Sequence, residues 1–221
     1  MRISVVIPAL GEEATIQAAI TSARATLEPS EVIVADGGSA DGTRELALAA
    51  GAAVVDAPGT RADAMNAGAR EATGEVLLFL HADTILPERA GDSVRAALAR
   101  VDGGAFSVRF DHRPGLARFA AALYERFHRG VYGDQAIFVT RAAFDSVGGY
   151  RPLPIMEDFD LVQRVRRVGR FVVLPDTVTT SARRQRAHGE VRTFFTVAAI
   201  KLLYRLGVSP ARLARLYRRL G

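Results

Sequence analysis

The sequence predicts an α/β fold: a mostly parallel sheet with helices on both faces, followed by a basic helical tail. Short apolar segments alternate with amphipathic helical segments in the first half of the chain, as in parallel strands joined by right-handed crossovers. Residues 76–80 are five consecutive apolar residues, which indicates a strand buried on both faces. Residues 183–221 contain 10 of the 29 basic residues and one of the 24 acidic residues, a local charge of +9. The charge therefore divides the chain into a mildly acidic domain and a strongly basic tail.

Composition narrows the class of protein further. With 221 residues, 49% of them hydrophobic, the chain is long enough for one large domain with an appended tail. Cysteine is absent, so any metal must be bound by oxygen and imidazole ligands. The acidic charge of residues 1–182 argues against nucleic acid as a partner. No signal peptide and no stretch of roughly 18–20 apolar residues is present. We therefore expect a cytoplasmic protein, peripheral on the inner face of the membrane where its tail makes contact.

The first half of the chain contains four predicted strands and three predicted helices. The first strand, residues 3–7, is closed by Pro8, and the helix that follows has an apolar stripe from Ile16 to Leu27. The remaining elements are strands at 31–35, 53–55 and 75–80, a helix ending near Ala50, and a helix at 60–72.

After Pro87, the predicted strands and helices no longer alternate regularly. The predicted elements are a helix to about Arg100, a strand at 103–110, a helix at 116–128, a strand at 135–139, helices at 141–147 and 157–169, and a strand at 170–174. No linker is evident before residue 182. We therefore expect one domain at 1–182, with a nucleotide-binding half at 1–100 and a second half at 101–182, followed by amphipathic helices at 183–221.

Polar residues follow two predicted strands where ligands bind in open α/β sheets. His81 and Asp83 come directly after the central strand, and an extended backbone would point both toward one cation or one phosphate. Asp36 closes the second strand beside two glycines, where its carboxylate can accept hydrogen bonds from a base or ribose. The alternatives are a capped strand end at His81 and Asp83 and an ordinary strand-to-helix turn at Asp36.

Two further clusters lie in the second half of the chain. Glu157 and Asp158 open a helix after a proline-containing loop, and helix capping is the alternative role for such residues. A cationic patch suited to a diphosphate, or to a solvated loop, is formed by Arg183, Arg184, Arg186 and His188. Neither a Gly-x-Gly-x-x-Gly motif after the first strand nor a Walker lysine motif is present, which argues against a dinucleotide dehydrogenase and a phosphate-loop ATPase.

Several motifs occur together in a fixed order. They are VVIPALGEE (5–13), VADGGSADGT (34–43), GTRADAMNAG (59–68), LFLHAD (78–83), GGY (148–150) and MEDFDL (156–161). In order and spacing this series resembles family 2 glycosyltransferases over about residues 3–175. The ending TSARR (180–184) is similar to a small bacterial subgroup of that family.

The resemblance implies a GT-A fold, that is, a Rossmann-type mostly parallel sheet, with residues 101–182 as the acceptor half. It also implies a UDP- or GDP-sugar donor with Mg²⁺ or Mn²⁺ on its diphosphate. By that analogy, the donor site comprises Pro8, Ala9, Glu12 at the ribose, Asp36 at the base, Arg61 at the nucleotide, Ala82, Arg183 and Arg184. Asp83 would be the metal carboxylate, with His81, which replaces the first carboxylate of the usual Asp-x-Asp, as a neighbour and His188 as a distal ligand.

The same resemblance implies an inverting transfer of a single sugar to an acceptor hydroxyl. Asp158 would be the general base and Glu157 would orient the acceptor. The Gln-x-x-Arg-Trp signature and membrane helices of processive synthases are missing, which favours a single transfer. Two alternatives remain. One is a sugar-phosphate nucleotidyltransferase, although Gly11-Glu12-Glu13 does not match the Gly-x-Gly-Thr-Arg signature of that class. The other is a non-catalytic nucleotide-sugar-binding module docked on a membrane, although both carboxylate clusters are retained.

The basic tail contains two predicted apolar stripes. The first comprises Val191, Phe194, Phe195, Ala198 and Leu202, and the second comprises Leu213, Leu216, Tyr217 and Leu220. Four arginines surround the second stripe, which is typical of a helix lying in the interface of an anionic membrane. The alternative is that both stripes pack on the domain or on a second subunit in a homodimer.

Overall fold

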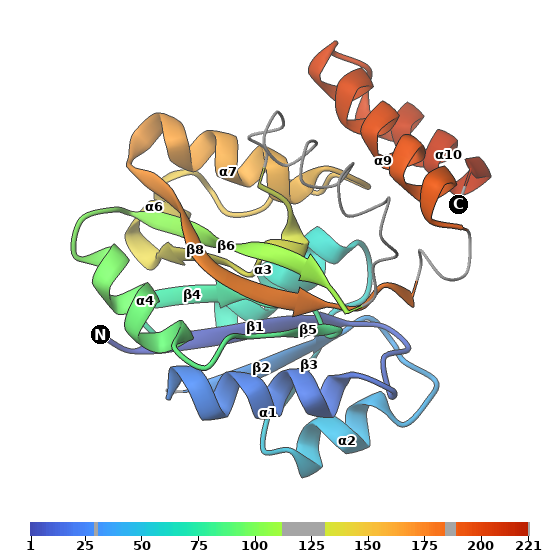
Figure 1. Ribbon diagram of the computed structural model, residues 1–221. Helices are drawn as coiled ribbons and strands as arrows, with labels where there is room; N and C mark the ends of the chain where they lie inside the picture. Colours follow the sequence, from blue (N-terminus) through green and yellow to red (C-terminus); the bar gives the residue numbers. More distant parts are fainter. Residues whose placement is uncertain (29–30, 112–130, 184–188, 221) are drawn as a thin grey trace.

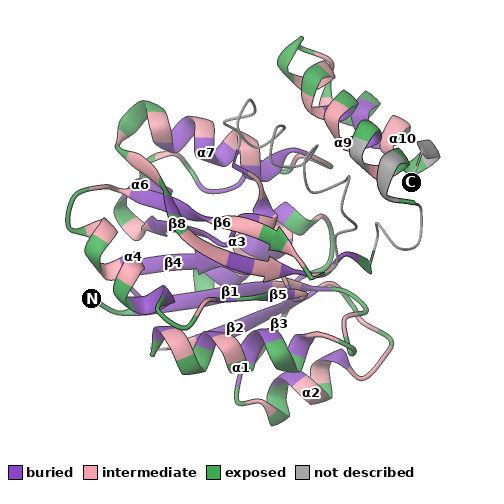
Figure 2. Ribbon diagram, in the orientation of Figure 1, coloured by how far each residue is buried: buried purple, intermediate pink, exposed green. Residues whose placement is uncertain are grey.

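The computed structural model describes residues 1–28, 31–111, 131–183 and 189–220. Within these residues one sheet runs through the molecule in the strand order β3-β2-β1-β4-β7-β6-β8-β5 (Figure 1). The strands are β1 (Ile3–Ala9), β2 (Glu31–Asp36), β3 (Ala53–Asp56), β4 (Val76–Phe79), β5 (Thr84–Ile85), β6 (Gly103–Phe110), β7 (Ile137–Thr140) and β8 (Phe171–Thr180). Buried residues are concentrated in these strands, and the exposed residues lie mainly on the outer faces of the helices (Figure 2).

The first four strands are parallel, as the alternation of elements predicts. Helices α1 (Ile16–Leu27), α2 (Thr43–Ala49) and α3 (Arg61–Glu71) connect them. Successive residues of β1 face opposite sides of the sheet: Val5 packs in one core with α1, and Val6 packs in another with α3. The buried face of α1 is the predicted stripe: Ile16, Ala19, Ile20, Ala23 and Leu27.

Helix α3 lies unusually close to the sheet. A Cβ atom at Gly68 would overlap the side chain of Val6, so this position of the helix admits only a hydrogen atom. The close packing fixes the start of α3 over the edge of the sheet where β1 ends.

The second half of the domain departs from the parallel pattern. β7 is inserted antiparallel between β4 and β6, while β6 and β8 run parallel. The other elements here are helices α4 (Ala90–Leu98), α6 (Arg141–Ser146) and α7 (Glu157–Val168) and a 3₁₀ turn, η1 (Gly133–Gln135). Because β7 is antiparallel to β4, η1 lies at the edge where β4 ends.

Several element boundaries differ from the prediction. Gln135 belongs to η1 rather than to a strand, and the last strand continues from Leu174 to Thr180 because it pairs with β6 as far as Phe110, across a register shift. The two-residue strand β5 was not predicted; it pairs with the end of β8. The predicted helix at 116–128 lies outside the described residues.

The basic tail forms two helices, α9 (Glu190–Arg205) and α10 (Pro210–Leu220), which pack on the domain. Ile200 and Leu213 are buried together with Met156, directly before α7. In the predicted stripe of α10, Leu213 is buried, which fits the packing alternative at that residue, whereas Phe195 and Leu202 of the predicted α9 stripe are 65% and 58% exposed. The membrane contact expected for both stripes stays a prediction. Apolar residues occur on two faces of α9, and the sequence alone did not distinguish them. None of the described helices is long and apolar enough to cross a membrane.

We predict that Gly68→Val destabilises the protein by about 1–3 kcal/mol, because the added side chain must displace Val6 or the helix. Loss of glycine from a helix interior would by itself stabilise the fold slightly, so a net loss of stability would come from the steric overlap with Val6. The measurement is urea unfolding of both proteins.

Arg70→Val is the matched control, since it introduces the same side chain at an exposed position of α3. We expect it to change the free energy of unfolding by about 0.5 kcal/mol or less. Equal stability of Gly68→Val and the parent would contradict the close packing.

Candidate active site

Polar residues from seven segments meet at the edge of the sheet where β1, β2 and β4 end. Most of the predicted donor-side residues lie at the ends of these three strands, and the starts of α3 and α7, η1 and the end of β8 complete the edge. Ala9 and Ala82 are buried in its floor, and Pro8 is partly buried in β1 beside them. The parallel strands therefore bring together residues that are far apart in the chain.

Asp36 is buried at the end of β2 and is held by hydrogen bonds. Its carboxylate accepts hydrogen bonds from the Ser39 hydroxyl at 2.5 Å and from Arg44 at 3.1 Å, and also from the Ser39 backbone N–H. Burial raises the pKa of Asp36, but the hydrogen bonds from Ser39 and Arg44 outweigh burial and lower the pKa below its usual value. Asp36 is therefore an anionic acceptor fixed beside the glycine turn.

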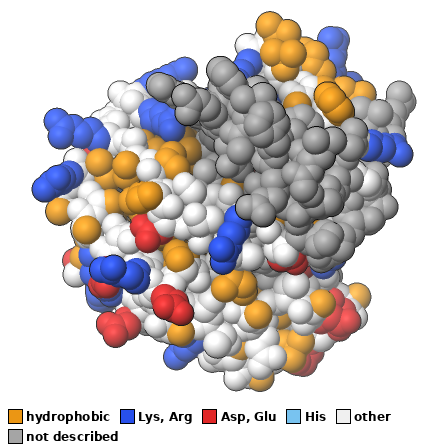
Figure 3. Space-filling view, viewed as in Figure 1, with side chains coloured by type: hydrophobic (Ala, Val, Ile, Leu, Met, Phe, Trp, Pro, Cys, Tyr) orange, Lys and Arg blue, Asp and Glu red, His pale blue; other side chains and the backbone are white. Residues whose placement is uncertain are grey.

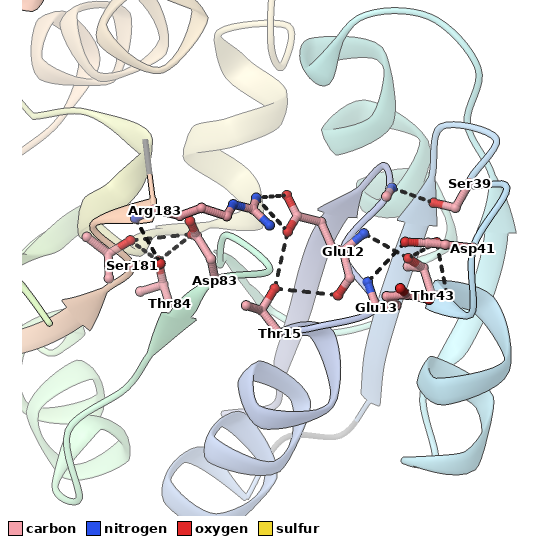
Figure 4. A network of polar contacts seen from close by, with 12 residues as sticks. Glu12, Glu13, Thr15, Ser39, Asp41, Thr43, Asp83, Thr84, Ser181 and Arg183 are labelled. Carbon is pink, nitrogen blue, oxygen red and sulfur yellow. Dashed lines mark hydrogen bonds and ion pairs between the residues drawn. The ribbon is translucent and has the colours of Figure 1, made fainter. Parts of the chain in front are cut away.

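Glu12 and Arg183 form an ion pair across the mouth of the site (Figure 4). One guanidinium nitrogen of Arg183 lies 3.0 and 2.9 Å from the two carboxylate oxygens of Glu12. The backbone N–H of Glu12 donates to the Thr43 hydroxyl, which fixes the loop after β1 against α2. The structure thus joins the predicted ribose residue to the predicted diphosphate residue.

Asp83 lies beside this pair, at the junction of β5 and β8 (Figure 4). Its Oδ1 atom accepts hydrogen bonds from the hydroxyls of Thr84 and Thr180, both at 3.4 Å, which is long for such bonds. Its backbone carbonyl accepts a hydrogen bond from Ser181, two residues before Arg183. β-pairing therefore places the end of β8 next to Asp83.

Arg61 connects the two halves of the domain. A capping box formed by Thr60 and Asp63 makes Arg61 the first residue of α3. Its Nε atom donates to Glu157 at 2.6 Å, and a terminal nitrogen lies 3.5 Å from Asp158 Oδ2. Both carboxylates are buried, and they occupy the first turn of α7, where the helix dipole favours negative charge.

Asp158 has the most perturbed environment among these groups. Burial raises the pKa of Asp158 to about 7; Arg61 acts against burial, while Glu157 acts with it. Its Oδ1 atom is buried without a hydrogen bond of good geometry among the described residues. A Cβ atom at Gly133 would overlap both Asp158 Oδ2 and His81 Nε2, so both side chains lie against Gly133. Asp158 thus combines a pKa near neutrality with a buried carboxylate, and a hydrogen bond from the nearby Tyr150 hydroxyl acts to lower that pKa.

Asp134 is a site residue that the sequence reasoning missed. It follows Gly133 in η1, and its electrostatic environment includes Lys201 of α9, Arg61 and Asp83. Desolvation raises its pKa, while Lys201 and Arg61 act against that shift. The available signal was the Gly-Asp pair before a predicted strand, but only the antiparallel order of β7 brings that pair to this edge.

The predicted metal ligands are only partly assembled. Among the residues that the structure describes, no three His, Cys, Asp or Glu side chains are grouped so that they could hold a metal ion. His188 and Arg184 lie outside the described residues. Asp83 nevertheless suits a hard cation, because Mg²⁺ is commonly bound by one or two carboxylates together with substrate phosphates. The long hydrogen bonds at Asp83 Oδ1 leave this oxygen weakly held.

The fold is of the GT-A type, and solved structures with this fold align with it. A mannosyltransferase from Pyrobaculum calidifontis, in complex with GDP-Man and Mn²⁺, aligns with a TM-score of 0.71 and 19% identity over 98% of this chain and 68% of its own. S. aureus TarS in complex with UDP-GlcNAc aligns with a TM-score of 0.65 and 17% identity over 82% of this chain and 58% of its own.

The sequence comparison gives the family. The profile of glycosyl transferase family 2 matches residues 4–146, and the chain belongs to that family. Glucosyl-3-phosphoglycerate synthase of Mycobacterium tuberculosis is 37% identical over 97 residues, which cover 38% of this chain and 30% of the relative. The match thus spans less than a third of the length of this curated relative. The resemblance seen in the motifs is therefore confirmed at the level of family and fold.

The raised pKa of Asp158 predicts a pH-dependent stability difference. A carboxyl group whose pKa is about 7 in the folded state and near 4 in the unfolded state binds more protons when folded, so its contribution to stability is present at low pH and is lost as the pH rises through 7. Asp158→Asn removes this titration. We expect the variant to gain stability relative to the parent between pH 5 and pH 8, measured by urea midpoints.

Asp145→Asn is the matched control, because Asp145 is exposed on α6 and the charge change is the same. Its stability difference from the parent should not vary appreciably over this pH range. A pH-independent difference for Asp158→Asn would show that Asp158 is ionised throughout.

Proposed function

We propose that the protein transfers a single sugar from a nucleotide-diphosphate sugar, UDP- or GDP-linked, to an acceptor hydroxyl with inversion at the anomeric carbon. The observation that carries this proposal is Asp158: a buried carboxyl group with a pKa of about 7 and an unsatisfied oxygen, on the opposite side of Arg61 from the nucleotide-binding half. Membership of glycosyl transferase family 2 supports the reaction class. The UDP-GlcNAc and GDP-Man complexes of the aligned structures support the donor class.

The donor would occupy the edge formed by the ends of β1, β2 and β4. Asp36 offers fixed acceptor oxygens for the base, and Glu12 offers a carboxylate for the ribose hydroxyls. Arg183 would exchange its bond to Glu12 for the diphosphate, where a guanidinium makes strong charge-assisted hydrogen bonds. Asp83 would hold Mg²⁺ or Mn²⁺, which would offset charge on the leaving diphosphate. The Mn²⁺ complex of the aligned mannosyltransferase supports this assignment.

Asp158 would act as the general base. The acceptor hydroxyl would give its proton to the Asp158 carboxylate as its oxygen bonds to the anomeric carbon. The bond from that carbon to the diphosphate breaks on the opposite face, which gives inversion. Arg61 would hold Asp158 in place, and Glu157 would fix Arg61 through its 2.6 Å bond.

The reaction class is tested by incubating the protein with a panel of nucleotide sugars and acceptor alcohols in the presence of Mn²⁺. Release of nucleoside diphosphate supports sugar transfer, and release of pyrophosphate from nucleoside triphosphate and sugar phosphate would support the nucleotidyltransferase alternative. Donor binding by calorimetry with neither product would support the binding-module alternative.

Asp158→Asn is expected to lower turnover by about 10²-fold or more while donor binding and the melting temperature at pH 6 stay close to those of the parent. The amide is nearly isosteric and can still cap α7, but it cannot accept the acceptor proton. The measurement is initial-rate kinetics with calorimetry of donor binding. Turnover kept within a fewfold of the parent would show that Asp158 only caps the helix, and Asp160→Asn, in the same turn, controls for the loss of charge.

Asp83→Asn is expected to abolish the metal-dependent part of donor binding, because an amide oxygen is a much weaker ligand for a hard cation than a carboxylate. Calorimetry with UDP- and GDP-sugars, with and without Mn²⁺, measures this part directly. Asp56→Asn, on the exposed end of β3, is the matched control. Unchanged Mn²⁺-dependent binding in Asp83→Asn would contradict the metal assignment.

A further inference from the structure

Helix α9 has two apolar faces, and only one of them is buried against the protein. Ile200 is buried on the inner face, which contacts Met156 before α7. On the opposite face Phe195 and Leu202, together with Leu206 directly after the end of the helix, are 65%, 58% and 71% exposed. Their spacing of i, i+7 and i+11 places them in one stripe along the helix. The outer face of α9, defined by these three residues, is therefore an apolar surface directed away from the domain.

Basic side chains border this stripe. Arg192 and Arg205 are exposed and lie on either side of it by helical position, and the guanidinium of Arg205 also lies 5.8 Å from the centre of the Phe159 ring. Arg212, Arg215 and Arg218 are exposed on the neighbouring helix α10. Figure 3 shows hydrophobic and basic side chains together on the tail helices, at the top right of the view. The only acidic residue of the tail is Glu190, so the surface is strongly cationic.

We propose that the outer face of α9 docks on an anionic lipid bilayer, with Phe195, Leu202 and Leu206 inserted at the level of the headgroups. An apolar stripe with arginines on both sides matches what interfacial helices use: burial of apolar area together with attraction to anionic lipids. A second copy of the chain fits less well, because a twofold contact through the same face would bring its arginines together. Charge complementarity thus selects the membrane as the partner.

Docking would also orient the enzyme. The inner face of α9 contacts Met156, the residue before Glu157, so the bilayer would lie about one helix diameter, ~10–12 Å, from that end of α7. The docking surface is independent of the sugar-transfer proposal, since none of its residues belongs to the site described above.

The test is flotation of the full-length protein with vesicles of phosphatidylcholine that contain phosphatidylglycerol, compared with vesicles of phosphatidylcholine alone. We expect binding to the anionic vesicles, little binding to the neutral ones, and weaker binding as the salt concentration rises. The double variant Leu202→Gln/Leu206→Gln should reduce the partition coefficient about tenfold, because it removes inserted apolar area and keeps the charge.

Leu48→Gln is the matched control, since Leu48 is a 59% exposed leucine on α2, on the far side of the molecule in Figure 1. It should bind like the parent, and the double variant should have the far-ultraviolet spectrum of the parent. The proposal is overturned if the parent ignores anionic vesicles, or if the double variant binds them equally well. It is also overturned if light scattering shows a dimer that the double variant converts to monomer, since the face would then be a subunit interface.

Discussion

The site depends on one guanidinium group held between two buried carboxylates. Arg61 begins α3, which packs on the parallel half of the sheet, and it bonds to Glu157 and Asp158, which begin α7 in the second half. Two adjacent buried carboxylates without a counter-charge would cost several kcal/mol, so this contact fixes how α7 sits against α3. It also limits how far the pKa of Asp158 rises, because burial and Glu157 favour the protonated form of Asp158 and Arg61 favours the ionised form.

The sequence was sufficient for the parallel half because the relevant constraints there are local. A stripe of apolar residues fixes the buried face of α1, and parallel strands must end at the same edge, so the strand pattern alone places Asp36 and Asp83 together. The pairing of Asp83 with β8 and of Glu12 with Arg183 involves residues 97 and 171 positions apart. No local pattern specifies such contacts, and only the family motifs suggested that these residues share a site.

The second half could not be derived in this way. Asp134 reaches the edge only because β7 is inserted antiparallel next to β4, and strand order is decided by long-range packing rather than by the segment itself. The buried face of helix α9 likewise could not be predicted from its own sequence. Its sequence is apolar around much of its circumference, and the face that becomes buried is the one that meets Met156. The apolar face with Leu202 stays exposed, and the sequence left open whether that face packs on the domain or contacts a membrane.

Electrostatics finally constrains how a donor can bind at this edge. Carboxyl groups outnumber cationic side chains among the site residues described above: Glu12, Asp36, Asp83, Asp134, Glu157 and Asp158 against Arg44, Arg61, Arg183 and Lys201. A nucleoside diphosphate brings further negative charge, so it would be repelled unless cations are released to it or arrive with it. The Glu12–Arg183 pair is the one to open, because Arg183 is 53% exposed and such pairs are worth about 1 kcal/mol or less. The Arg61 contact, by contrast, joins buried carboxylates and is expected to persist. A divalent cation on the diphosphate would supply the rest of the compensation beside Asp83, so donor and metal are expected to bind as a unit.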